Sequence, residues 1–302
     1  MSNKKNCSCE FFGNNKKLQK KSQIKEFQEK DFYDIIIDVN SIIGLNEGWK
    51  IECTEDGLKK WNEFKNQSLL KIRILGDDNK SKSFIISKLY QNILPSGDSI
   101  RTKGLSIKYL ELQEEHPHSK FILLNTAGLE NPILTEENEE EVPLEDKNYE
   151  GINKFKIKAR DILTAENFLQ NFVISTSDLL LIVINELSFS EQKLINKIKA
   201  EIKINNYKKI NQTIIIIHNL KTYRTKKQVE AYIDEILCKS FTYKVRKNDN
   251  VTCKIGSSKD RVYFIEPNNH ECSVFHLLFA ADGSEAGDYY NNNCNRFYRE
   301  KI

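Results

Sequence analysis

The sequence predicts an α/β fold in which helices cover both faces of a mainly parallel central sheet, giving three layers, α/β/α. From residue 69 onward, short runs rich in Ile, Leu and Val alternate with stretches whose apolar residues recur at helical spacing. Runs dominated by apolar residues are typical of strands buried on both faces. The candidate strands are residues 70–75, 105–112, 121–124, 178–184, 213–217 and 262–266.

Two of the intervening helices are marked clearly in the sequence. Ser188 followed by Glu191 forms a capping box, which satisfies backbone N–H groups at the start of a helix. That helix places Leu194, Ile195 and Ile198 on one face, and a second stripe comprises Val229, Tyr232, Ile233, Ile236 and Leu237. Stripes of this kind are typical of core faces rather than binding faces.

Composition limits the classes of partner. The 302 residues include 46 basic and 43 acidic side chains, a net charge of +3, so nothing global favours a nucleic acid. No apolar run approaches the ~20 residues that span a bilayer, so membrane contact is expected to be peripheral if it occurs at all. The N-terminus lacks a signal peptide, and seven scattered Cys form no disulfide framework, which together predict a cytoplasmic protein.

The chain divides into three parts by composition. Residues 1–30 hold eight Lys against three Glu and are expected to form a basic flexible tail. Residues 31–68 contain one strand-like run, Asp34-Ile-Ile-Ile-Asp-Val, and a short helical stretch at 57–64, so an ordered extension is expected. Residues 69–302 form the main domain. Within it, residues 130–150 hold nine acidic residues and one Lys, which predicts a solvated surface loop.

The strongest motif follows the first strand of the main domain. The segment Gly76-Asp-Asp-Asn-Lys-Ser-Lys82-Ser83 matches the phosphate-loop pattern Gly-x-x-x-x-Gly-Lys-Ser/Thr, except that Ser81 replaces the second Gly. The backbone of Gly76, Asn79, Lys80 and Ser81 is expected to wrap an anion with its N–H groups. Lys82 is expected to reach the outer phosphates, and the Ser83 hydroxyl to ligate Mg²⁺. The alternative is an ordinary strand-to-helix turn.

Two later segments extend this site. Thr102 lies in the loop before the second strand, where a hydroxyl could complete the coordination of Mg²⁺. Asn125-Thr-Ala-Gly128 follows the third strand, which puts Asn125 at a strand end and lets the Gly128 N–H contact a γ-phosphate. His218, at the end of a later strand, could stack on a base, although a buried and hydrogen-bonded histidine is the alternative.

Taken in this order, the segments of residues 69–302 resemble the G domain of P-loop GTPases. More narrowly, a set of short strings resembles dynamin-like or guanylate-binding-protein-like G-domain proteins of protists: Asp38-Val-Asn-Ser-Ile, Thr102-Lys-Gly-Leu-Ser, Asn125-Thr-Ala-Gly, Phe189-Ser-Glu-Gln, Ile217-His-Asn-Leu and Ser284-Glu-Ala-Gly. The resemblance implies GTP or GDP with Mg²⁺ as ligands. It assigns Gly76, Lys82 and Ser83 to the phosphate loop, Thr102 and Gly128 to the two switches and Asn219 to the base site.

The sequence departs from the family pattern in three ways. Asn125 stands where the family has Asp, which should weaken metal binding. The segment Asn219-Leu-Lys-Thr222 lacks the carboxylate that reads guanine. No Gln or Arg is marked by its context as a water-orienting group or an arginine finger, so hydrolysis stays open.

Three functions are therefore considered. The first is a Mg²⁺-dependent guanine-nucleotide-binding protein, a slow GTPase switch with Lys82 and Thr102 as its catalytic groups. Its partner would be a protein effector or a second copy bound through the G domain. The second is an interaction module that binds no nucleotide, and the third is an ATP-binding protein of the same loop class.

Overall fold

A computed structural model describes residues 29–39, 41–44, 48–76, 82–90, 104–111, 120–126, 150–205, 212–240, 246–247, 264–266 and 272–301. The strands are β1 (Ile35–Asp38), β2 (Lys50–Cys53), β3 (Leu70–Leu75), β4 (Gly104–Glu111), β5 (Lys120–Thr126), β6 (Leu179–Ile184), β7 (Gln212–Leu220), β8 (Arg246–Lys247), β9 (Phe264–Ile265) and β10 (Cys272–Ala280). The α-helices are α1 (Glu55–Phe64), α2 (Lys82–Tyr90), α3 (Glu150–Thr176), α4 (Phe189–Asn205), α5 (Lys226–Tyr232) and α6 (Glu285–Lys301).

The strands form one mixed sheet in the order β2-β1-β4-β5-β3-β6-β7-β10-β9-β8. The central strands β5, β3, β6, β7 and β10 run parallel. The pairs at both ends of the sheet, β2–β1, β1–β4, β4–β5, β10–β9 and β9–β8, are antiparallel. The expectation of a mainly parallel sheet was therefore wrong. Two antiparallel strands can be joined without the long crossover connection that parallel strands need. The strands β1 and β2 come from residues that the sequence assigned to a separate extension.

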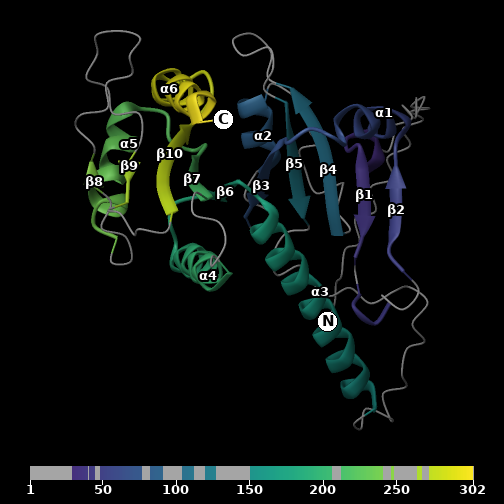
Figure 1. The fold of residues 1–302 in the computed structure, drawn as a ribbon. Helices are drawn as coiled ribbons and strands as arrows, with labels where there is room; N and C mark the ends of the chain where they lie inside the picture. The colour runs from purple at the N-terminus through teal and green to yellow at the C-terminus, as the bar shows by residue number, and fades with distance from the viewer. Residues whose placement is uncertain are drawn as a thin grey trace, which may run out of the picture.

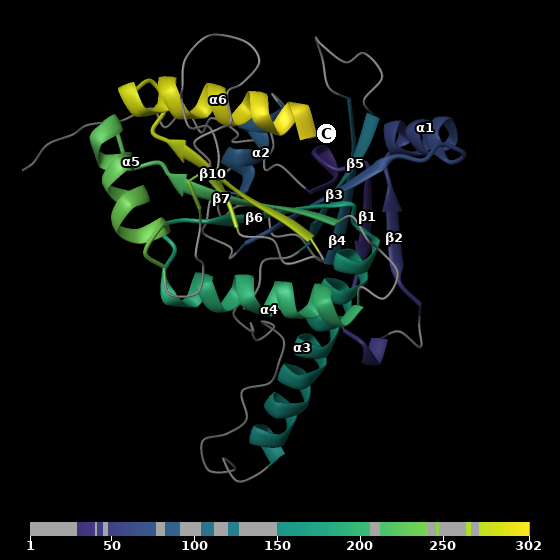
Figure 2. The ribbon, with the colours of Figure 1, turned by 60° about the vertical axis from the view of Figure 1, so that its left-hand side comes forward.

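Helices lie on both sides of the sheet, which gives the three expected layers (Figures 1 and 2). Helices α2 and α6 cover one face of the sheet, which is called the α2/α6 face. The core beneath them includes Ile85 of α2 and Phe297 of α6. Helices α3 and α4 cover the opposite face, which is called the α3/α4 face. Val173 of α3 and Ile195 of α4 are fully buried there. The lower half of α3 projects beyond the sheet (Figures 1 and 2).

The capping box predicted at residue 188 is confirmed. The Glu191 carboxylate accepts the backbone N–H of Ser188 at 2.7 Å, and the Ser188 hydroxyl accepts the N–H of Glu191 at 3.4 Å. Glu191 also accepts the N–H of Asn185 at 2.7 Å and is only 2% exposed. It therefore fixes the turn between β6 and α4 as well as the start of the helix.

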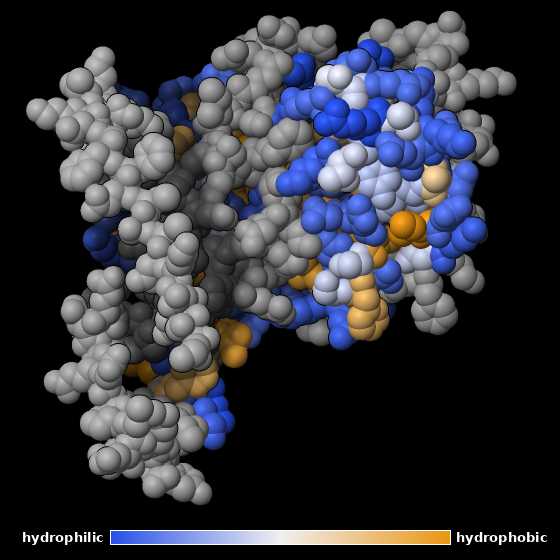
Figure 3. Space-filling model, turned by 180° about the vertical axis from the view of Figure 1, so that it is seen from behind, coloured by the Kyte–Doolittle hydropathy of each residue, from blue (hydrophilic) through white to orange (hydrophobic). Residues whose placement is uncertain are grey.

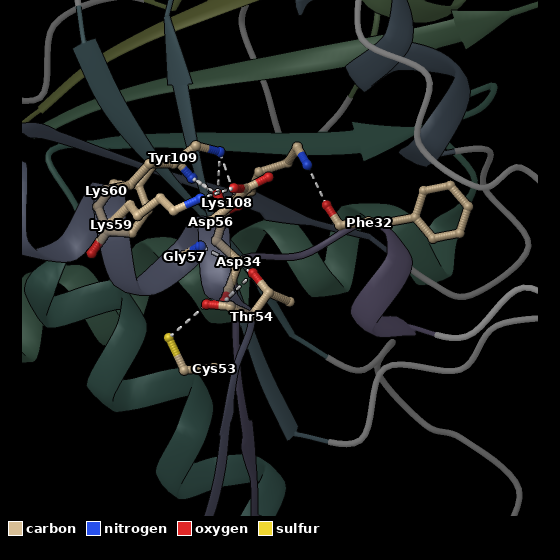
Figure 4. Close-up of polar contacts among 10 residues, drawn as sticks. All are labelled: Phe32, Asp34, Cys53, Thr54, Asp56, Gly57, Lys59, Lys60, Lys108 and Tyr109. Atoms are coloured by element: carbon tan, nitrogen blue, oxygen red, sulfur yellow. Dashed lines mark hydrogen bonds and ion pairs between the residues drawn. The ribbon is translucent and has the colours of Figure 1, made fainter.

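The N-terminal extension is joined to the main sheet through Asp34, a buried residue just before β1 (Figure 4). Its carboxylate pairs with Lys60 of α1 at 2.9 Å and accepts the backbone N–H of Tyr109 in β4 at 2.7 Å. Its carbonyl accepts the N–H of Thr54, the N-cap of α1, at 3.0 Å. One residue thus links β1, α1 and β4.

Figure 3 shows the molecule from behind. Where residues are described, this face is predominantly hydrophilic, with small and separate hydrophobic areas. Among the described helices, none is long and apolar enough to cross a membrane.

Candidate functional site

The candidate site lies at the edge of the sheet where the parallel strands end. The register pairs Ile74 near the end of β3 with Asn125 in β5, and Leu220 at the end of β7 with Ala280 at the end of β10. Open α/β sheets bind ligands outside the carboxyl ends of their strands. Gly76, Asn125 and Asn219 therefore lie along one edge of the sheet.

Gly76 occupies a position that only glycine tolerates. It follows β3 with a φ of 153°, and an added Cβ would lie 2.6 Å from the backbone oxygen of Val183 in the neighbouring β6. Real Cβ atoms do not approach a backbone oxygen this closely, and a side chain also disfavours this φ. The absence of a side chain thus lets the chain leave β3 tightly against β6.

Lys82 is the first residue of α2, and its ammonium reaches back to Gly76. Its Nζ donates a hydrogen bond to the carbonyl oxygen of Gly76 at 2.8 Å. A positive charge therefore stands where the helix presents its N-terminal backbone N–H groups, and both favour an anion. Asn79, Lys80 and Ser81 lie outside the described residues, as does the side chain of Ser83.

Asn125 lies in β5, next to β3, on the α2/α6 face of the sheet. It is 7% exposed, and its amide nitrogen donates to the hydroxyl of Tyr33 at 2.8 Å. The amide oxygen is the atom that could accept from a metal-bound water. Thr102 and Gly128 lie outside the described residues, but β4 begins at Gly104 beside the end of β5. Within the described part of the chain, no group of three His, Cys, Asp or Glu could hold a metal ion.

Neighbouring residues His218 and Asn219 in β7 point to opposite faces of the sheet, because strand side chains alternate. Asn219 lies on the α2/α6 face with Lys82 and is 3% exposed. His218 lies on the α3/α4 face and is fully buried, with ring nitrogens bonded to Tyr232 and His276. The structure therefore agrees with the second interpretation of His218, a buried and hydrogen-bonded histidine.

His218 belongs to a buried hydrogen-bond network in which the donor and acceptor of each bond can be assigned. Lys199 donates to the Glu266 carboxylate at 2.6 Å, and His276 Nε2 contacts the same carboxylate at 3.0 Å. Because the ionised carboxylate only accepts, His276 Nε2 carries a proton and its Nδ1 accepts from His218 Nε2 at 2.9 Å. His218 Nδ1 then accepts from the Tyr232 hydroxyl at 2.6 Å.

Burial and the neighbouring charges determine the protonation states of His218, His276 and Glu266. It lowers the pKa of His218 well below the ordinary value, and the nearby His276 lowers it further. Burial also lowers the pKa of His276, although the hydrogen bond to Glu266 opposes this shift. Burial alone would raise the pKa of Glu266, but the bonds from His276 and Lys199 outweigh it and lower the pKa. Both histidines are therefore neutral and Glu266 is ionised near pH 7.

The sequence did not predict β10, whose carboxyl end completes this edge. Ser273 and His276 interrupt its apolar residues, which hid a strand that is largely buried. The turn after β10 lies beside the segment that follows β7, because the N–H of Ala281 donates to the carbonyl of Tyr223 at 3.0 Å. This turn carries Asp282, whose carboxylate pairs with Lys88 of α2 at 2.6 Å and accepts from Asn291 at 3.2 Å.

Arg73 in β3 is a second residue that the sequence did not single out. It is fully buried on the α3/α4 face and donates to the carbonyl of Gln170 in α3 at 2.6 Å and to the Thr126 hydroxyl at 3.4 Å. Burial lowers the pKa of its guanidinium to about 9, and the charge of Glu201 partly offsets this effect. Arg73 thus joins β3, the end of β5 and α3 on the face opposite Lys82.

The sequence and the fold were compared with those of known proteins. No family model matches the sequence. Over 277 residues the chain is 26% identical to a protein of Dictyostelium discoideum named as a heat shock protein. This match covers 86% of the chain but only 38% of that relative, so the chain spans well under half of the relative's length.

Among solved structures, the chain is similar to a GTP-binding protein from the archaeon Sulfolobus solfataricus in complex with GDP. The two share 13% identity with a TM-score of 0.35, over 82% of this chain and 57% of that one. A likeness at this level carries no argument about function.

Proposed function

We propose that this chain binds a nucleoside triphosphate with Mg²⁺ at the carboxyl edge of its sheet, prefers GTP, and acts as a slow GTPase switch. The observation that carries the proposal is the geometry of Gly76 and Lys82. A glycine whose position excludes a side chain follows β3, and the first residue of α2 holds its ammonium at the carbonyl of that glycine. Backbone N–H groups, the helix dipole and a lysine together favour a phosphate chain.

In this proposal the polyphosphate replaces the carbonyl of Gly76 as the hydrogen-bond partner of the Lys82 ammonium. Ser83 and Thr102 keep their proposed roles as Mg²⁺ ligands, and Asn125 accepts from a metal-bound water. The metal would neutralise charge on the phosphates, which lowers the barrier to their transfer. Gly128 keeps its proposed contact with the γ-phosphate, whose loss would mark the switch for a protein effector.

Recognition of guanine needs an acceptor for its N–H groups. Thr222 cannot supply a carboxylate, but Asp282 lies in the adjacent turn and reaches α2 on the same face as Asn219. We infer that Asp282 accepts from guanine while Asn219 contacts the base. Because adenine presents a different pattern of donors and acceptors, this carboxylate favours GTP over ATP.

The test is equilibrium binding of fluorescent GTP and ATP analogues, with and without Mg²⁺. Lys82→Ala removes a charge-assisted contact worth about 3 kcal/mol, so affinity for both analogues should fall about 100-fold or more. Lys59→Ala is the matched control, because Lys59 is an exposed lysine of α1 that pairs with the exposed Asp56. Asp282→Asn should reduce the preference for GTP over ATP without abolishing binding of either.

The second candidate, an interaction module that binds no nucleotide, is favoured by one observation. The amide that replaces the usual carboxylate at position 125 is engaged by Tyr33 from the extension, a contact that needs no metal. This candidate predicts no saturable binding at millimolar nucleotide and identical behaviour of Lys82→Ala and the wild-type chain. Binding of both analogues with equal affinity would instead support the ATP-binding alternative.

A further inference from the structure

The outermost strand on the extension side of the sheet is β2. It pairs with β1 on its inner side and is the first strand in the sheet order (Figure 1). Within the described ranges no strand lies against its outer side, and all four of its residues are exposed. An edge strand of this kind offers the backbone N–H and C=O groups of its outer side to another strand.

Apolar groups continue past this edge on the α3/α4 face. Ile51 pairs with Ile37, which packs on the core beneath α3, yet Ile51 itself is 62% exposed. Trp49, just before β2, lies with its ring centroid 5.8 Å from that of Phe168 in α3, and both are more than a third exposed. An uncovered apolar strip at an open sheet edge is typical of an interaction surface.

The other face of β2 carries charges of both signs. Lys50 and Glu52 lie on the same side of the strand, with their charged atoms 2.6 Å apart. Single-sign charges, especially lysines, protect edge strands from pairing with copies of themselves. The alternating charges of β2 provide no such protection, because they are complementary to the same sequence running in the opposite direction.

The register of a self-pairing follows from this pattern. If two copies of β2 pair antiparallel about Ile51, Lys50 of each copy lies opposite Glu52 of the other. Ile51 then meets Ile51, and Trp49 meets Cys53, on the apolar face. A shift by two residues brings Lys50 opposite Lys50 or Glu52 opposite Glu52, which is unfavourable in cross-strand pairs. Charge and apolar pattern therefore select one register.

We propose that two copies of this chain associate through β2, pairing antiparallel about Ile51 so that the two sheets become continuous. The contact is isologous, as a two-fold dimer requires. It uses the edge of the sheet farthest from β10 and involves neither Lys82 nor Asp282, so it stands independently of nucleotide binding.

Charge reversal at β2 tests this proposal. Lys50→Glu alone and Glu52→Lys alone each place two like-charge pairs in the contact, so each should weaken dimerisation by about 30-fold or more. An equimolar mixture of the two variants restores both opposite-charge pairs and should form a heterodimer. The double variant Lys50→Glu/Glu52→Lys should dimerise as the wild-type chain does.

Mass is measured by sedimentation velocity of the full chain from about 1 to 100 µM, a range that brackets the Kd of weak protein dimers. Lys227→Glu reverses an exposed charge on α5 and should leave the mass unchanged, and thermal unfolding confirms that each variant is folded. A wild-type chain that stays monomeric throughout overturns the proposal. So do single variants that dimerise like the wild type, which would indicate another interface, and a mixture that fails to pair.

Discussion

The buried histidines of β7 and β10 should make folding sensitive to mild acid. His218 and His276 are neutral members of the chain that runs from Tyr232 to Glu266, and both are fully buried. In the unfolded chain their pKa returns to about 6.5. Below that pH the unfolded state therefore binds more protons than the folded state, and the free energy of unfolding falls as pH falls.

The size of the effect follows from linkage. A histidine that stays neutral when folded and has a pKa of about 6.5 when unfolded loses about 1.4 kcal/mol of stabilisation between pH 7.5 and pH 5.5. His218, whose pKa burial lowers furthest below the ordinary value, should contribute this full amount. His276 adds up to as much again, so the pair should account for a loss between about 1.4 and 3 kcal/mol. Glu266, whose pKa is lowered from 4.5, contributes only at lower pH.

The assay is urea-induced unfolding at pH 7.5 and at pH 5.5, for the wild-type chain and for His218→Gln. Glutamine does not titrate, but it can still accept from Tyr232 and donate to His276. Any packing defect lowers stability at both pH values, whereas the lost titration reduces the difference between them by about 1.4 kcal/mol. If the wild type and His218→Gln lose the same stability between the two pH values, His218 is not held neutral and the reasoning fails.

Two further predictions concern stability at neutral pH. Gly76→Ala should destabilise the fold by more than about 2 kcal/mol, because its Cβ would meet the oxygen of Val183 in addition to the strain of a positive φ; Gly48→Ala, which has a φ of 86° but open space around it, should cost less, about 1 to 2 kcal/mol. Equal shifts in thermal unfolding for the two glycine variants would contradict the close contact. Asp34→Asn removes the charge that pairs with Lys60 and should cost about 1 to 3 kcal/mol in chemical denaturation, and an unchanged midpoint would show that Asp34 is not a structural link.

The sequence predicted the central strands well because their signal is local. Residues 179–184 are apolar throughout, and every one of them is buried in β6. The predicted strands at 70–75, 105–112, 121–124 and 213–217 are likewise confirmed as β3, β4, β5 and β7, with small differences at their ends. Strands buried on both faces have little freedom to be anything else.

Strand order and direction were predicted less well, because pairing depends on contacts far apart in the sequence. β1 was recognised as a strand, but nothing near Asp34 shows that it pairs with β4, some 70 residues later in the chain. β10 was missed because two polar residues interrupt it, and only the structure shows that His276 is paired inside the core. For the candidate site, Gly76 and Lys82 were proposed from their spacing, whereas Asp282 and Arg73 lie outside any short motif.

The missed and the predicted features meet at the same edge of the sheet. The extension supplies Tyr33, which holds the amide of Asn125, and β10 leads into the turn that carries Asp282. The first of these segments was assigned from sequence to a separate extension, and β10 was not predicted as a strand. A nucleotide bound at Gly76 and Lys82 would therefore share this edge with Tyr33, which lies just before β1, and with Asp282, which lies just after β10. Nucleotide binding should therefore stabilise the whole sheet rather than the loop alone, because segments from both ends of the chain lie at this edge.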